Sequence, residues 1–260
     1  MYRDKRFRIR KVADILEDIA VARDTMNTRL VRSVFLADGN SVIMRPSQLI
    51  EILRCLYDSF PELTRVTSYG ATQYLAAKSA DDMAALRQAG LTRIHCGMES
   101  GDDEVLGLVC KGANAEVQIC GGRNVKNAGM EVSFYVMPGL GGVERSEQHA
   151  VGSAAVLSAV KPDFIRLRTF LPQAGTEIAQ DCLQGRLTLQ TPHQTLREIR
   201  RMLELLDADG SMVVSDHWLN FAPVEGRLPE DKPLMLEVID RALQLPESAF
   251  REVGIYDGML

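Results

Sequence analysis

The sequence predicts an α/β protein whose parallel strands form a barrel or an open barrel. Between residues 33 and 168, apolar strand-like runs alternate with amphipathic helical patterns. The connections are short, as is typical of right-handed crossovers between parallel strands. The side chains that could bind a ligand or take part in catalysis follow directly after strands, at the edge where parallel α/β proteins bind ligands.

The composition is that of an ordinary globular protein. The chain has 260 residues, of which 46% are hydrophobic and 25% charged, enough for one domain with a full core. The net charge of −5 gives no general electrostatic reason to bind nucleic acid or an anionic membrane. Neither a membrane-spanning apolar run nor the apolar core of a signal peptide is evident. We therefore expect a cytoplasmic protein.

Neither the five cysteines nor the four histidines have metal-ligand spacing. No two cysteines form CxxC or CxxxCxxC, and no two histidines form HxH or HxxxH. We expect neither a disulfide framework nor a metal site built from these side chains alone. The residues concerned are Cys55, Cys96, Cys110, Cys120, Cys182, His95, His149, His193 and His217.

The chain opens on a helix where a strand–helix unit would open on a strand. Residues 1–11 are strongly basic, and residues 12–23 place apolar side chains at helical spacing. The strand that should precede this helix is missing from the pattern. Later strands are predicted over 33–37, 65–69, 91–97, 130–137 and 163–168, and later helices over 46–59, 80–89, 102–109, 114–128 and 144–160.

The last third of the chain is predicted to extend the same domain. A long helix over 191–209 ends before Gly210, and a strand over 211–215 follows. One or two helices over 230–251 close the fold. Because no low-complexity linker interrupts the chain, we divide it into a partial barrel, residues 1–182, and a C-terminal extension of the same domain, residues 183–260.

The third predicted strand ends in the stretch that organises the candidate site. Glu99 and Ser100 lie between Gly97 and Gly101, where a buried strand gives way to the N-terminus of a helix. Glycines let a ligand approach the backbone, and the helix start offers free N–H donors. We expect the Glu99 carboxylate to contact a hydroxyl or ammonium group. The alternative is a turn whose solvated acids cap the helix.

The segments that directly follow the other strands, here called the strand exits, carry further candidate site residues. Alternation places Arg166 and Arg168 on the same side of a strand, and whether that side faces the interior or solvent stays open. The loop that contains His217 and Trp218 either lines a substrate pocket or is held in place by these two side chains as a structural anchor. The remaining exits read Asp38-Gly39-Asn40, Ser68-Tyr69-Gly70 and Pro138-Gly139-Leu140-Gly141-Gly142.

With these units placed, the chain resembles the radical S-adenosylmethionine superfamily. It is most similar to the iron–sulfur oxidoreductase branch related to oxygen-independent coproporphyrinogen oxidase and Elongator-type barrels. Five stretches carry the resemblance in their order and spacing: FLADGN at 35–40, RIHCGMESGDDEVL at 93–106 followed by KG at 111–112, SFYVMPGLGG at 133–142, IRLRTFLPQAGT at 165–176 and SDHWLNFAPVEGRLPEDK at 215–232.

The resemblance implies a partial (β/α)6 TIM-like barrel with a C-terminal helical extension, which holds S-adenosylmethionine and a [4Fe–4S] cluster. In the family, reductive cleavage of the bound cofactor gives a 5′-deoxyadenosyl radical that abstracts a hydrogen atom from the substrate. The protein orients such a cofactor and excludes side reactions.

The resemblance also implies which residues contact the cofactor. The turn at 37–40 lies where the family binds the methionyl amino group, and Glu99 and Ser100 lie where it binds the ribose or the amino acid. Ser133 and the turn at 137–139 lie near the expected adenosyl pocket. A guanidinium of the fifth strand could pair with the cofactor carboxylate. The candidates are Asp38, Gly39, Asn40, Ser68, Glu99, Ser100, Ser133, Gly139, Arg166 and Arg168.

The sequence departs from the family in one major respect, because the defining CxxxCxxC is absent. Three thiolates hold three irons of the cluster and leave the fourth iron open to the cofactor. The missing strand is the one that should precede that loop. We expect the chain to begin just downstream of the cluster loop, and to be inactive by itself. A barrel that has lost its cluster is the alternative.

Three functions therefore remain open. The first is a radical S-adenosylmethionine enzyme acting on an unknown small molecule, and the second is a cluster-free barrel that binds a small molecule or a partner protein. The third is an ordinary barrel enzyme that uses Glu99 or Asp38 as acid or base. The missing strand should also leave one barrel edge unpaired, through which two copies could associate.

Overall fold

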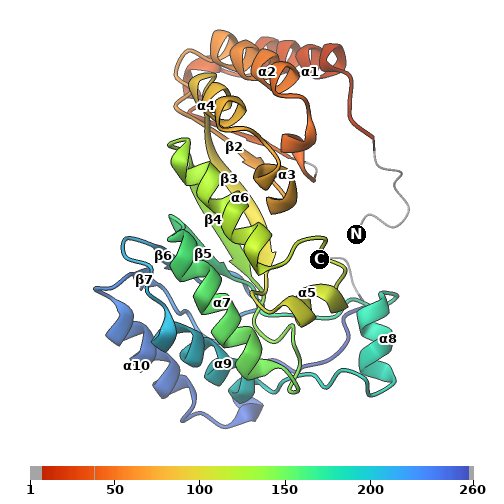
Figure 1. Ribbon diagram of the computed structural model, residues 1–260, viewed down its shortest axis with the longest axis vertical. Coiled ribbons are helices and arrows are strands. Elements are labelled where there is room, and N and C mark those ends of the chain that lie inside the picture. The colour runs from red at the N-terminus through yellow and green to blue at the C-terminus, as the bar shows by residue number, and fades with distance from the viewer. Residues whose placement is uncertain (1–7, 38, 258–260) are drawn as a thin grey trace.

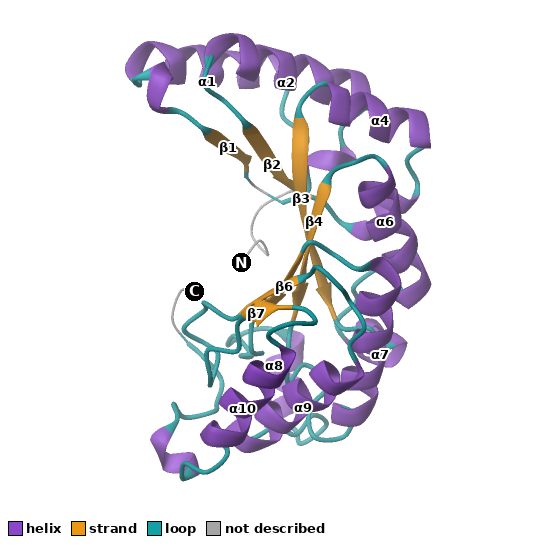
Figure 2. Ribbon diagram, turned by 90° about the vertical axis from the view of Figure 1, so that its left-hand side faces the viewer, coloured by secondary structure: helices purple, strands orange, loops and turns teal. Residues whose placement is uncertain are grey.

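The computed structural model describes residues 8–37 and 39–257. Its centre is one seven-stranded sheet in which the strands follow one another in chain order (Figures 1 and 2). Strands β1 to β6 are parallel, and β7 is antiparallel to β6. The strands are β1 Ser33–Leu36, β2 Arg65–Tyr69, β3 Leu91–Glu99, β4 Glu131–Val136, β5 Phe164–Leu167, β6 Met212–Val214 and β7 Gly226–Arg227.

The sheet curves, and helices α1, α2, α4, α6 and α7 lie along its outer side (Figure 2). Strands β1 and β7 lie at the two ends of the strand order, so the curved sheet is open. The helices are α1 Val12–Thr25, α2 Pro46–Ser59, α3 Thr72–Ala76, α4 Ala80–Gln88, α5 Asp103–Leu108, α6 Ala115–Asn127, α7 Ser146–Val160, α8 Glu177–Leu183, α9 Pro192–Leu205 and α10 Lys232–Ala242.

Side-chain alternation separates a core face from a concave face. In β3, Ile94, Cys96 and Met98 are fully buried in the core formed with the helices. The residues between them, among them His95 and Gly97, face the concave side. The same alternation in every parallel strand gives the sheet one apolar face under the helices and one face that carries polar and aromatic groups.

The predicted fold class is confirmed, because the structure is a mostly parallel α/β sheet of the partial TIM-barrel type. The C-terminal segment continues this sheet, since β6 pairs with β5 in parallel. Within the described residues, no helix is long and apolar enough to cross a membrane.

Several element boundaries differ from the prediction. The third strand extends two residues further than predicted, to Glu99, and the predicted helix over 191–209 ends at Leu205. Leu206 leaves the helix with extended backbone angles and is buried, as is Ala208. Helices α3 and α8 and strand β7 were not predicted, because such short elements leave too few residues for a periodic signal.

Candidate active site

Glu99 ends β3 in the left-handed region of backbone space, with φ of 65°. Its Oε1 lies 3.0 Å from Nζ of Lys111, and about a quarter of each side chain is exposed. A Cβ on Gly97 would lie 2.1 Å from this Oε1 atom. The glycine therefore gives the carboxylate the space in which it lies back over the strand and meets Lys111.

Backbone contacts join the β3 exit to its neighbours. The backbone oxygen of Glu99 accepts a hydrogen bond from the Met137 amide at 2.9 Å, which ties the β3 exit to the β4 exit. The Arg145 guanidinium donates to both carboxylate oxygens of Asp102, at 2.6 and 3.0 Å, at the start of α5. The segment around Glu99 is therefore held on both sides.

A buried set of polar side chains lies behind the two exits. The Ser100 hydroxyl lies 2.9 Å from Nδ1 of His149, and Nε2 of His149 lies 3.6 Å from Oε1 of Glu198. That oxygen accepts the Gly139 amide at 2.7 Å. The order serine, histidine, acid is that of a nucleophilic triad, but Ser100 is fully buried and no substrate reaches it.

An aromatic band crosses the concave face from β1 to β4. The ring centroids of Phe35 and Tyr69 lie 4.8 Å apart, and those of Tyr69 and His95 lie 6.2 Å apart. His95 Nδ1 and the Tyr135 hydroxyl share a hydrogen bond of 3.1 Å. Burial, helped by nearby Arg166, lowers the pKa of His95 to about 4, so this ring is neutral at pH 7.

The two arginines of β5 lie at the end of this band. Arg166 faces the concave side, because Ile165 and Leu167 on either side of it are buried in the core. Its Nη1 atom lies 3.6 Å from Asp216, and its buried Nε atom has no hydrogen-bond partner among the described residues. The positive charge of Arg168 lowers the pKa of His217, so Arg168 lies close to that loop.

The remaining predicted residues fall into two groups. Ser133 lies on the concave side of β4, fully buried, and its hydroxyl has no partner within the described part of the chain. Ser68 lies on the core side of β2, and its hydroxyl donates to the Tyr69 carbonyl oxygen instead. The structure therefore brings Ser133 to the same face as the aromatic band, and does not bring Ser68 there.

The turn after β1 is joined to the β2 exit. Gly39 has φ of 87°, which favours glycine, and Asn40 Oδ1 accepts the Ala71 amide at 3.0 Å. Asp38, the acidic candidate of this turn, lies outside the described residues. The exits of β1 and β2 thus form one edge of the site.

Three partners of the site were not assigned a role from the sequence: Lys111, His149 and Glu198. Glu198 carried a usable signal, because it lies between Leu196 and Ile199 on the buried face of α9. A carboxylate in an apolar stripe indicates a specific buried partner. His149 shows a similar signal beside Ala150 in α7.

The family model for the radical SAM superfamily matches residues 2–152, more than half of the chain. The chain belongs to the radical SAM superfamily. This confirms the resemblance that was noted from the strand-exit motifs. Among curated proteins, none matches this chain.

Solved radical SAM structures share the fold. Archaeal Elp3 from Methanocaldococcus infernus, with an N-terminal deletion, is 14% identical, covers 92% of this chain and has a TM-score of 0.58. Escherichia coli coproporphyrinogen III oxidase is 16% identical, covers 74% and also scores 0.58. Methylornithine synthase is 18% identical, covers 98% and scores 0.52. At these identities the likeness concerns the fold alone.

This radical SAM chain spans only part of its structural relatives. It covers 59% of the Elp3 chain, 44% of the coproporphyrinogen III oxidase chain and 70% of the methylornithine synthase chain. Activities of those whole proteins therefore do not transfer to this chain by similarity.

The residues present fit S-adenosylmethionine. The concave side offers a carboxylate at Glu99 for hydroxyl or ammonium groups, and guanidiniums for a carboxylate. Two buried polar atoms there, Ser133 Oγ and Arg166 Nε, have no partner among the described residues. Gly139, with φ of 86°, is buried, and a Cβ added there would make an ordinary van der Waals contact with Thr195 Oγ1 at 3.6 Å.

The residues present do not fit a [4Fe–4S] cluster. Cys96 is buried on the core side of β3, where burial raises the pKa of its thiol to about 12. Cys55 and Cys120 lie on α2 and α6. Across residues 8–37 and 39–257, no three histidine, cysteine or acidic side chains converge to hold a metal ion. The described side chains therefore offer no ligand set for a cluster.

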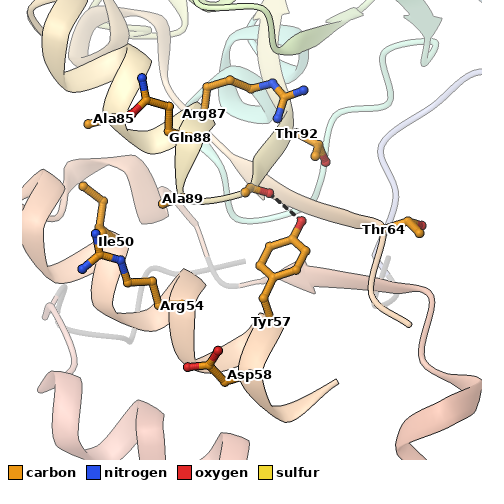
Figure 3. A pocket seen from close by; sticks show the side chains of 11 residues that line it. Ile50, Arg54, Tyr57, Asp58, Thr64, Ala85, Arg87, Gln88, Ala89 and Thr92 are labelled. Atoms are coloured by element: carbon orange, nitrogen blue, oxygen red, sulfur yellow. Dashed lines mark hydrogen bonds between the residues drawn. The ribbon is translucent and has the colours of Figure 1, made fainter. Parts of the chain in front are cut away.

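A separate cavity lies at the other end of the sheet. A cavity of about 710 Å³ lies between α2 and α4, beside the residues that precede β2 and β3. The Tyr57 hydroxyl donates to the Gly90 carbonyl oxygen at 2.8 Å across it (Figure 3). In barrel enzymes the N-terminal ends of strands serve stability, whereas chemistry lies at their C-terminal ends.

Proposed function

We propose that this chain binds S-adenosylmethionine across the exits of β1, β3, β4 and β5. The observation that carries the proposal is the concave face itself, where Glu99 and the β5 guanidiniums offer opposite charges to an adenosyl amino acid. When bound together with a reduced iron–sulfur cluster, S-adenosylmethionine supplies radical chemistry. The residues of this chain bind and orient it.

Each end of the cofactor is assigned to a complementary group. Glu99 accepts hydrogen bonds from ribose hydroxyls, and Lys111 holds the carboxylate in place for this role. The turn at 39–40 contacts the methionyl ammonium. Arg168 pairs with the cofactor carboxylate, because no described residue forms an ion pair with it, whereas Arg166 already meets Asp216.

Isothermal titration calorimetry with S-adenosylmethionine tests this assignment. Glu99→Gln should weaken binding about tenfold, because it replaces charged acceptors by a neutral amide. Arg168→Gln should weaken binding of S-adenosylmethionine but not of 5′-methylthioadenosine, which has no carboxylate. Arg87→Gln, on α4 beside the cavity between α2 and α4, is the matched control and should leave affinity unchanged. Absence of binding to the wild-type chain would overturn the proposal.

We propose further that radical generation requires thiolate ligands from outside this chain. The support is the cysteine pattern, because the thiols do not have CxxxCxxC spacing and do not converge in the described residues. Anaerobic reconstitution of the chain with iron and sulfide should leave no stable [4Fe–4S] absorption. A stable cluster that cleaves S-adenosylmethionine would contradict this.

A cluster-free binding barrel is the second candidate function, and the same lack of convergent thiols favours it. It predicts that S-adenosylmethionine or its analogue S-adenosylhomocysteine binds without any cluster. The two candidates separate on one measurement: supplying a CxxxCxxC peptide with iron and sulfide yields cleavage activity under the first and none under the second.

A further inference from the structure

The buried chain of polar residues behind the site connects two turns that are far apart in sequence. It runs from Ser100, after β3, through His149 of α7 and Glu198 of α9 to Gly139, after β4. None of the three side chains is more than 3% exposed. Such a chain cannot contact a substrate, so its role must be exerted through the turns that it holds.

The first half, or arm, of this chain of polar residues consists of Ser100 and His149 and fixes the β3 exit. The Ser100 hydroxyl accepts the Asp102 amide at 3.0 Å and lies 2.9 Å from His149 Nδ1. Burial lowers the pKa of His149, so its ring is neutral and Nδ1 can accept the serine proton. Gln118 donates to the carbonyl oxygens of Met98 and Ser100 as well. Glu99 therefore lies between two residues whose backbone oxygens are both held.

The second arm fixes the β4 exit. Glu198 Oε1 accepts the Gly139 amide at 2.7 Å, and the Gln190 side-chain amide donates to Oε2 of Glu198 and to the Gly142 carbonyl oxygen. A carboxylate buried in the apolar face of α9 is costly unless hydrogen bonds compensate it. Here the compensating donors belong to, or contact, the glycine-rich turn.

The two arms converge on the same pair of strand ends. The Met137 amide donates to the Glu99 carbonyl oxygen, which joins the exits directly on the site side. Behind the site, Ser100 hydrogen-bonds to His149 and Glu198 hydrogen-bonds to the Gly139 amide. Between them, His149 Nε2 packs 3.6 Å from Glu198 Oε1 without a hydrogen bond to any described residue, so this second link between the β3 and β4 exits is a buried packing contact.

We infer that His149 and Glu198 are positioning residues, which hold Glu99 and the Gly139 turn at a fixed spacing through Ser100. The structural part of this inference stands on the contacts alone. Its consequence for cofactor affinity rests on the proposed function, because the two turns are the parts of the site assigned to the ribose and the adenosyl group.

Amide hydrogen exchange tests the structural part without any ligand. Ser100→Ala does not touch Gly139, yet it should speed exchange of the Gly139 amide by about threefold to thirtyfold, the usual range for coupled sites. Glu198→Leu should speed it at least as much, and Glu198→Gln, which keeps an oxygen acceptor, should restore most of the protection. Leu203→Ala, also buried in α9, is the control for general loosening.

Cofactor affinity tests the functional part. Binding of S-adenosylhomocysteine should weaken about tenfold in His149→Leu and recover in His149→Asn, whose side-chain oxygen can accept the Ser100 proton. Should Glu198→Leu fail to fold, the Ser100 and Glu198→Gln variants still decide the matter. If Leu203→Ala speeds exchange of the Gly139 amide as much as Ser100→Ala does, the inference is overturned. If the wild-type chain binds no cofactor, only the proposed function fails and the exchange result stands.

Discussion

At the scale of single residues, the site depends on one missing Cβ. Gly97 allows the Glu99 carboxylate to lie over the strand, and the atoms that an added Cβ would meet are the mobile ends of Glu99 and Lys111. Gly97→Ala should therefore change the free energy of unfolding by less than about 1 kcal/mol, because these ends can move away. It should weaken S-adenosylmethionine binding about tenfold, since the carboxylate is displaced. Urea denaturation and calorimetry separate the two effects.

The neutral state of His95 makes the fold sensitive to acid. Its pKa is lowered to about 4, mainly by burial and then by Arg166. A histidine with a folded-state pKa below its unfolded value stabilises the fold above about pH 6.5, and this contribution is lost as the pH falls toward 4. His95→Gln should remove part of that loss, on the order of 2 kcal/mol. His149, whose pKa is also lowered by burial, contributes to the loss of stability that remains in acid.

Unfolding by urea at pH 7 and pH 5 measures the difference between His95→Gln and the wild type. Val151→Ala, on the exposed face of α7, is the comparison variant, because it removes no titratable group. An equal slope in His95→Gln and the wild type would show that His95 is not the acid-sensitive group.

At the scale of elements, α7 approaches the β3 exit more closely than a side chain permits. A Cβ on Gly152 would lie 2.6 Å from the Gly101 carbonyl oxygen, and a Cβ on Gly101 would lie 2.2 Å from that of Gly152. Replacing a glycine within a helix by alanine normally stabilises the fold by about 0.5 to 1 kcal/mol. Here we predict that Gly152→Ala destabilises by about 1 to 3 kcal/mol, because backbone cannot move aside.

The control for Gly152→Ala is Val151→Ala on the exposed face of the same helix, which should change stability little. Urea midpoints give both values. Stabilisation by Gly152→Ala would mean that α7 can shift away from the β3 exit, and that this exit is not held rigidly.

At the scale of the whole molecule, the sequence predicted what depends on local pattern. The strand-helix alternation defined the parallel sheet, and Glu99 was found because a buried run ends beside it. Its partner Lys111 lies 12 positions further along, and the contact between Ser100 and His149 spans 49 positions. The first pair depends on the path of the segment between α5 and α6, and the second on how α7 packs, and no local period encodes either. The orientation of Arg166 likewise became clear only once both of its neighbours were seen in the core.

At the scale of the assembly, the open sheet presents β1 as an edge at which a second copy can pair. Within the described residues β1 pairs only with β2, and Leu30, next to this edge, is 75% exposed. An edge strand beside exposed apolar side chains is a template for pairing with another chain. We predict that the apparent mass in light scattering rises with protein concentration, and that Leu30→Lys suppresses the rise. Leu183→Lys, at a leucine of α8 that is 69% exposed, should not suppress it, and a constant monomer mass for the wild type would contradict the prediction.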